Sequence, residues 1–281
     1  MTETEQAHLA SGALRSLYEK VRIFFEDHGL GPSTPSVAAD DLIQFPRRES
    51  VVTLHIQASL LLIQGAEHLS AFLELTSYKT PSLAPSANAR AIVENSALAR
   101  WLFDSNIPIR RRVRRSLALR YADLIQQKKI VKARDKNTDI TKIDQRIDAI
   151  EALSVELGFE LIINKKGNRD GVGERMTPFT EIVKNEIDHE ANYRVLSSLT
   201  HGNVSTLRQL GYQIIGDDRL GDGAIIEGYV SPLVILYMIH VVADAFSQAV
   251  EAKTRLFGWD IERLTRELNP LLRTLNSSVG N

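Results

Sequence analysis

The sequence predicts an all-α fold, a bundle of six to eight helices, on three observations. Apolar residues recur at three- and four-residue spacing through most of the 281 residues. Strands and helices do not alternate in the order that builds a doubly wound sheet. The longest apolar run, from Val230 to Val242, contains a histidine and is shorter than the roughly 20 residues of a bilayer span. That run is typical of a buried core helix.

The chain is expected to divide near residue 48. Residues 1–48 contain a first helix, over residues 9–28, and then a stretch with three prolines and two glycines. That composition is typical of a linker or of a loop lying on the surface. Residues 49–281 form the main helical bundle.

Seven further helices are predicted in the main bundle, over residues 50–77, 86–103, 108–133, 138–157, 177–202, 232–257 and 260–275. The helix over 177–202 is expected with or without a break. Residues 160–163 are too few to assign, although a strand fits them, and the glycines of residues 165–175 indicate a loop. Residues 212–216 and 224–229 flank a turn rich in glycine and aspartate, which predicts a small β-hairpin around residues 211–230.

Composition excludes several classes of function. The 34 basic and 35 acidic residues give a net charge of −1, so no general attraction to nucleic acid or to an anionic membrane is expected. The chain has no cysteine, which excludes disulfides, thiolate metal sites and a cysteine nucleophile. Its first residues are acidic and polar, unlike a signal peptide. Together these features favour a cytoplasmic protein.

The segment from Tyr193 to Asn203 holds the best candidate for a reactive site. Arg194 and His201 are seven residues apart, which places them about 20° apart around a helix and about 10 Å apart along it. An arginine binds phosphate through paired donors, and a histidine transfers protons at neutral pH. Such a pair, doubled across a dimer, can cleave RNA through the RNA's own 2′-hydroxyl without a metal. Polar neighbours that would support the pair are Tyr193, Ser197, Ser198 and Asn203.

Structural alternatives stand beside these assignments. His201 lies next to Gly202 at an expected helix end, where an imidazole interacts favourably with the helix dipole. Arg90 and Glu94 have the spacing of an ion pair on a helix whose other residues are apolar. A structural ion pair is the favoured interpretation there, and a supporting role in the site is the alternative, since a buried glutamate needs a partner.

A second candidate surface is the basic start of the helix over 108–133. Five arginines fall within six residues, and they would bind phosphates or the acidic surface of a partner: Arg110, Arg111, Arg112, Arg114 and Arg115. They cannot all share one face of a helix, and a solvated face is the alternative.

Metal and cofactor chemistry is not expected. Glu186 and His189 form one Glu-x-x-His motif, whereas di-iron bundles need two such motifs and further glutamates. His240 and Asp244 share a helical face and are expected to form a buried hydrogen-bonded pair. The sequence has no nucleophile elbow, phosphate loop, dinucleotide fingerprint or zincin motif.

These motifs together resemble a known superfamily. Arg90 and Glu94 precede Trp101-Leu102, an arginine-rich helix start follows, and Ser197 precedes His201-Gly202. The pattern over residues 50–255 is similar to a group of bacterial helical proteins, and an arginine followed at short distance by a histidine resembles the HEPN superfamily.

Membership in that superfamily would imply a helical bundle, a homodimer and, in active members, metal-independent cleavage of RNA. It would place Arg194 and His201 in a composite site and suggests a role in a toxin or in phage defence. The alternative function is a non-catalytic, dimeric helical interaction module whose polar core residues are structural.

Overall fold

The all-α fold class is confirmed by a computed structural model. It describes residues 1–29, 31–77, 82–135, 138–167, 169–217, 224–228 and 230–277, and of residues 213–217 and 224–227 only the backbone. Within these ranges the chain forms eleven helices and two small antiparallel sheets of two strands each. The helices outnumber the expected eight because two short helices were not predicted and one predicted helix is broken.

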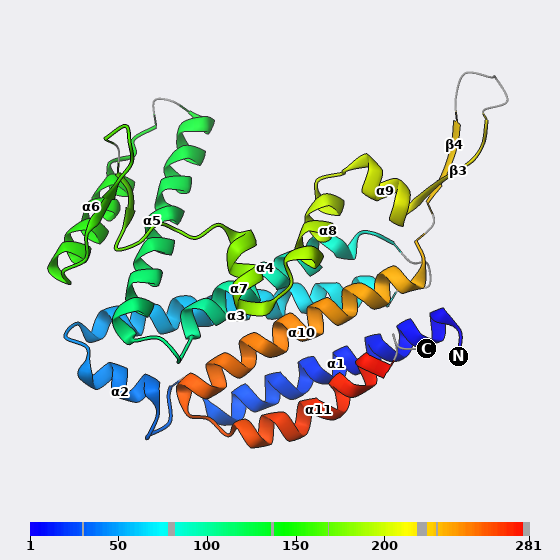
Figure 1. Cartoon of the computed structure of the whole chain (residues 1–281), viewed down its shortest axis with the longest axis horizontal. Coiled ribbons are helices and arrows are strands. Elements are labelled where there is room, and N and C mark those ends of the chain that lie inside the picture. The colour runs from blue at the N-terminus through cyan, green and yellow to red at the C-terminus, as the bar shows by residue number, and fades with distance from the viewer. Residues whose placement is uncertain are drawn as a thin grey trace.

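Long helices with roughly parallel axes make up the body of the molecule (Figure 1). They are α1 (Glu3–His28), α3 (Arg48–Thr76), α10 (Pro232–Phe257) and α11 (Ile261–Ser277), with α4 (Pro85–Phe103) packed on α3 and α10. The first helix begins earlier than residue 9 because Thr2 and Glu5 form a capping box. The Thr2 hydroxyl accepts from the Glu5 amide, and the Glu5 carboxylate accepts from the Thr2 amide.

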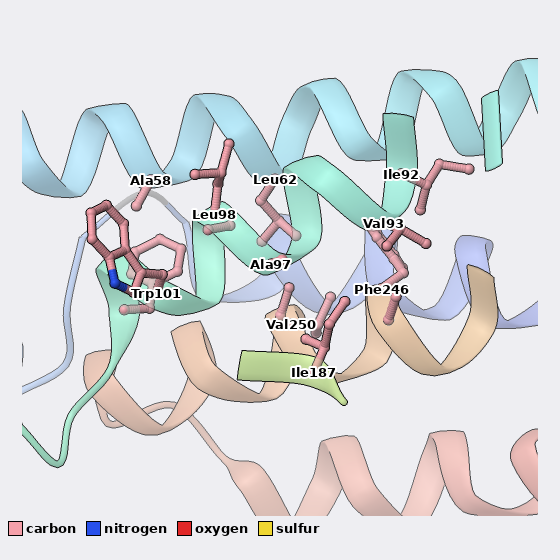
Figure 2. Close-up of a cluster of buried hydrophobic side chains, with 14 of the residues drawn as sticks. Ala58, Leu62, Ile92, Val93, Ala97, Leu98, Trp101, Ile187, Phe246 and Val250 are labelled. Carbon is pink, nitrogen blue, oxygen red and sulfur yellow. The ribbon is translucent and has the colours of Figure 1, made fainter. Parts of the chain in front are cut away.

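The hydrophobic core centres on α4, which is buried on nearly every side. Figure 2 shows Ile92, Val93 and Leu98 of this helix against side chains from three other helices, namely Ala58, Leu62, Ile187, Phe246 and Val250. Residues of α1 belong to the same core, among them Leu14, Leu17 and Phe24.

From Pro232 onward, the apolar run that begins at Val230 lies in α10, as expected for a core helix. This helix is long and apolar enough to cross a membrane, yet 67% of its most apolar window is buried inside the fold. Phe246 and Val250, for example, are buried in the core and lie beside α4 in Figure 2.

The segment 29–48 was predicted as a linker or loop, and that prediction is wrong for its second half. Residues Val37–Gln44 form helix α2, which starts where the Ser36 hydroxyl accepts from the Ala39 amide. Ala38 and Asp41 are buried. The prolines and glycines that suggested a loop lie on either side of this short helix.

One end of the molecule carries α5 (Ile109–Arg134) and α6 (Thr141–Glu156), which rise from the body together (Figure 1). Beside them, β1 (Leu161–Ile163) pairs with β2 (Arg169–Val172), so the loop predicted over residues 165–175 in fact contains a strand. Gly171 permits this geometry, because a Cβ there would lie 2.8 Å from the Glu174 carbonyl oxygen.

Helices α7 (Phe179–Ile187) and α8 (Glu190–Thr200) pack on α4, and α9 (Val204–Leu210) follows them toward the end that carries the β-hairpin (Figure 1). The helix predicted over 177–202 is broken at Asp188, which adopts a left-handed conformation with φ of 54°. Helix α9 was not predicted; the Asn203 side chain caps its start. The expected hairpin is confirmed as β3 (Tyr212–Asp217) paired with β4 (Ala224–Gly228), and its turn, residues 218–223, lies outside the described residues together with Tyr229.

Candidate functional site

Four of the predicted site residues meet where α8 packs on α4. The Arg90 Nη1 atom lies 2.9 Å from the His201 Nε2 atom. The Nε and Nη2 atoms of Arg90 donate to one oxygen of Glu94, at 3.1 and 3.0 Å. The Tyr193 hydroxyl donates to the same Glu94 oxygen at 2.6 Å. We call these four residues the Arg90–His201 cluster.

The contact with Arg90 identifies the ring nitrogen of His201 that accepts a hydrogen bond. A guanidinium has only donors, so the His201 Nε2 atom accepts the hydrogen bond and a neutral ring carries its proton on Nδ1. His201 ends α8 as its C-cap residue, with non-helical backbone angles, and it is exposed. The cluster therefore presents an imidazole and a guanidinium side by side near the surface.

Glu94 and Tyr193 hold Arg90 in position from the buried side. The side chains of Arg90 and Glu94 are 21% and 24% exposed, and Tyr193 is buried. Burial raises the pKa of Tyr193, and its hydrogen bond to Glu94 raises that pKa further. Burial acts to lower the pKa of Arg90, but the bond to Tyr193 and the charge of Glu94 outweigh it, so the net change is upward. Both groups stay protonated at neutral pH.

Arg194 is not part of this cluster. Its guanidinium donates to Glu190 at 2.9 Å, and its side chain is 66% exposed. No hydrogen bond between described side chains links Arg194 to His201. Arg194 and Ser198 instead line a separate cavity of about 560 Å³ between α8, α9 and the start of α10.

Two other predicted supporting residues have local structural roles. The Ser197 carbonyl oxygen accepts from the His201 amide at 3.0 Å, which closes the last turn of α8. The Asn203 side chain accepts from the Thr206 amide at the start of α9. Both residues thus shape the backbone around His201.

The five arginines at the start of α5 point to different partners and do not form one basic surface. Arg112 is buried and donates to the Asp41 carboxylate and to the carbonyl oxygens of Asp104 and Ile107. Arg115 is buried as well and donates to the Trp101 carbonyl oxygen at 2.6 Å.

The other three arginines are nearer to solvent. Arg110 donates to the Gly158 carbonyl oxygen and stacks on the ring of Phe159, 4.6 Å from its centroid. Arg114 lies over the same ring at 6.0 Å. Arg111 is exposed. Four of the five arginines thus contact the loops, strands and rings around α5, and Arg111 faces solvent.

A second polar network, not predicted as a unit, lies between α7, α8 and α10. The His189 Nε2 atom is 2.8 Å from the Asp244 carboxylate, and the Asn192 amide contacts the His189 Nδ1 atom at 2.6 Å. Tyr237 donates to Asn192, and Gln248 donates to Asp244. Burial acts to raise the pKa of Asp244, but the hydrogen bonds from His189 and Gln248 outweigh it and lower that pKa.

This network corrects one expectation. Asp244 was expected to pair with His240, but its hydrogen-bonded histidine is His189, and the buried Nε2 atom of His240 has no hydrogen-bond partner. Glu186 and His189 turn away from each other, because Glu186 faces Arg115. The spacing of Tyr237, Asp244 and Gln248 places them on one face of α10. That spacing could have predicted the polar network from the sequence. Among the described residues no three acidic or histidine side chains are grouped as metal ligands would be.

Fold and site together define an all-α protein with an arginine–histidine cluster at the junction of two helices. Comparison of the chain with protein-family models, with curated proteins and with solved structures found no match. The resemblance to HEPN proteins stays a prediction.

Proposed function

We propose that this protein binds RNA and cleaves it without a metal ion, and that Arg90 and His201 carry the reaction. The observation behind the proposal is the 2.9 Å contact between the Arg90 guanidinium and the His201 imidazole. A neutral imidazole can accept a proton, and a guanidinium can bind a phosphate oxygen. The two groups needed to activate a hydroxyl beside a phosphodiester are thus adjacent and reachable from solvent.

The proposed cleavage reaction uses the hydrogen-bonding groups of the Arg90–His201 cluster. The Arg90 Nη1 group exchanges its hydrogen bond to His201 for one to a phosphate oxygen, which frees the His201 Nε2 lone pair. That nitrogen takes the proton of the ribose 2′-hydroxyl as the 2′-oxygen bonds to phosphorus and the bond from phosphorus to the 5′-oxygen breaks. The leaving oxygen takes a proton from water. Glu94 and Tyr193 position Arg90 throughout, and the products are a 2′,3′-cyclic phosphate and a 5′-hydroxyl.

The test is cleavage of single-stranded RNA in the presence of a chelator, with wild type compared with His201→Ala. Wild type is expected to produce cyclic phosphate ends, and His201→Ala to be slower by about 10²- to 10⁴-fold, the usual contribution of a general base. Equal cleavage by both proteins, or cleavage by neither, would contradict the proposal.

Arg194→Ala is the matched control for the identity of the arginine. Arg90→Lys keeps the charge but loses the forked contact with Glu94, so it is expected to slow cleavage by about tenfold or more. Arg194→Ala is expected to leave the rate close to that of wild type. A large loss in Arg194→Ala with none in Arg90→Lys would move the role to Arg194.

A second candidate function is a dimeric interaction module, which an apolar stripe on α3 favours. Val52, Ile56, Leu60 and Ile63 follow one another at spacings of four, four and three residues, and the last three are 55%, 58% and 53% exposed. Such a stripe suits a helix packed on a copy of itself.

Sedimentation of wild type and of a double variant, Ile56→Glu combined with Leu60→Glu, tests this candidate function. Wild type is expected to sediment as a dimer and the double variant as a folded monomer, because two buried like charges would oppose association. A monomeric wild type at micromolar concentration would contradict dimerisation through α3. The RNA assay on the same double variant separates the two candidates, since neither residue lies in the Arg90–His201 cluster.

A further inference from the structure

Lys253 is a largely buried lysine whose ammonium faces aromatic rings and whose side chain also borders a cavity. Its residue is 7% exposed, and its Nζ atom lies 4.9, 5.3 and 5.1 Å from the ring centroids of Phe25, Phe257 and Trp259. Across the described part of the chain, no carboxylate or other acceptor contacts this ammonium within hydrogen-bond or ion-pair distance. Buried charges in folded proteins are normally paired, so this ammonium lacks the partner that burial requires.

A cavity opens beside Lys253. It has a volume of about 360 Å³ and lies between α1, α3 and α10, within the size range of small-molecule sites. Most of its wall is apolar and is formed by Val21, Phe25, Leu62, Ile63, Ala66 and Phe246. The other charged side chains that line it, Arg22 and Glu26, are paired with each other at 2.6 Å. Lys253 therefore supplies a charge to a cavity whose wall is otherwise mostly apolar.

The protonation of Lys253 indicates the charge of the ligand that it can bind. Burial lowers the pKa of Lys253 to about 8, so the amine is still mainly protonated at neutral pH. The faces of the surrounding rings also favour a cation. A ligand that brings one negative charge would provide the missing partner. A cation would be repelled, and a phosphate dianion would leave excess negative charge in the apolar cavity.

We propose that this cavity binds a small amphipathic monocarboxylate, with its carboxylate paired to the Lys253 ammonium and its apolar chain lying against α1 and α3. The site is separate from the Arg90–His201 cluster and does not depend on the RNA reaction. The Lys253 ammonium binds the carboxylate, and the apolar wall selects for ligands that have an apolar chain.

The test is calorimetric titration of the full chain with decanoate and, as an uncharged probe of equal length, decan-1-ol. Decanoate is expected to bind at one site, with an affinity at least tenfold above that of the alcohol. Lys253→Met removes the charge and keeps a long apolar side chain, so the protein should stay folded and lose at least tenfold in decanoate affinity. Lys132→Met, at an exposed lysine on α5, is the control and should bind as wild type does.

Ala66→Trp provides an independent variant, because it fills the cavity without changing any charge. It is expected to abolish binding of both probes. The proposal is overturned if wild type does not bind decanoate, if Lys253→Met binds it as tightly as wild type, or if Ala66→Trp leaves binding unchanged.

Discussion

Buried cations stabilise this fold in two different ways at the scale of single residues. Arg112 is 1% exposed, and its two terminal nitrogens donate to three acceptors, including the Asp41 carboxylate of α2. Lys253 is buried against aromatic faces without a carboxylate. The first arrangement ties α2 to α5, and the second leaves one charge available to a ligand.

Removal of the Asp41 carboxylate should therefore be costly. Asp41→Ala leaves the Arg112 guanidinium buried without its anion, and we expect a loss of about 3–5 kcal/mol in the free energy of unfolding, measured by urea denaturation. Asp40→Ala, at an exposed acid on the same helix, should cost less than about 1 kcal/mol. Similar losses for the two variants would show that the ion pair does not anchor α2.

His55 makes the stability depend on pH. Burial lowers its pKa to about 4, with the charges of Arg112 and Lys253 acting in the same direction, so the folded protein keeps His55 neutral where the unfolded chain is protonated. Its contribution to stability is complete above about pH 6.5 and falls by about 1.4 kcal/mol per pH unit down to about pH 4.

Comparison with His55→Phe isolates this effect from the titration of carboxylates. The free energy of unfolding of wild type is expected to fall more steeply between pH 6.5 and 4 than that of the variant. Phenylalanine keeps the ring contact with Phe257, whose centroid is 5.1 Å away, and removes the unpaired Nε2 atom. Parallel pH profiles would contradict a depressed pKa at His55.

Residue types that carry a site were recognisable in the sequence, but their contacts were not. Arg90, Glu94, Tyr193 and His201 were all chosen from spacing and chemistry, and the structure brings these four together. Helical spacing paired His201 with Arg194, because both lie on α8. Spacing along one helix contains no information on α4, which supplies the arginine that His201 contacts.

Short elements depend on single residues that fix the backbone, and Gly258 is one of them. It ends α10 with φ of 66°, and a Cβ there would lie 2.9 Å from the Pro35 carbonyl oxygen and 2.6 Å from the Ser36 Cβ. The turn from α10 to α11 therefore packs directly on the start of α2.

Two glycine substitutions should change stability in opposite directions. Gly258→Ala is expected to lower the free energy of unfolding by about 2 kcal/mol, through left-handed strain and the contact with Pro35. Gly12→Ala, in the exposed middle of α1 with open space around it, should raise it by about 0.5–1 kcal/mol. Thermal unfolding followed by circular dichroism measures both, and a gain at Gly258 would contradict the close approach of α2.

Periodicity predicted the long helices well and the short elements poorly. Helices α3, α4, α5 and α10 agree with their expected ranges because each has several turns of apolar spacing. Helices α2 and α9 and strand β2 are too short to show a clear period, and α2 depends on contacts with distant parts of the chain. Asp41 of α2, for example, is bonded by an arginine 71 residues further along the chain.

At the scale of the whole molecule, the first helix is part of the central core. Helix α1 packs between α10 and α11, and its Leu14, Leu17 and Phe24 have no exposed surface. Figure 1 shows these three helices side by side along the lower edge of the body. The apolar faces of α10 and α11 would be open to water without α1.

A truncated chain of residues 49–281 should therefore fail to fold on its own. We expect loss of a cooperative thermal transition and aggregation at micromolar concentration, because the truncation removes α1 and α2 together. Full-length protein is the control, in circular dichroism and light scattering. A cooperative transition of the fragment close to that of the full chain would show that residues 1–48 are a dispensable unit.

The packing of α1 on α10 and α11 also governs the timing of folding. Translation releases α1 first, whereas α10 begins only at Pro232, so most of the polypeptide must leave the ribosome before the two can meet. Contacts between distant parts of a chain form late and slowly. The apolar face of α1 therefore stays without its α10 partner until residues beyond Pro232 have been made, which leaves that face open to aggregation during synthesis.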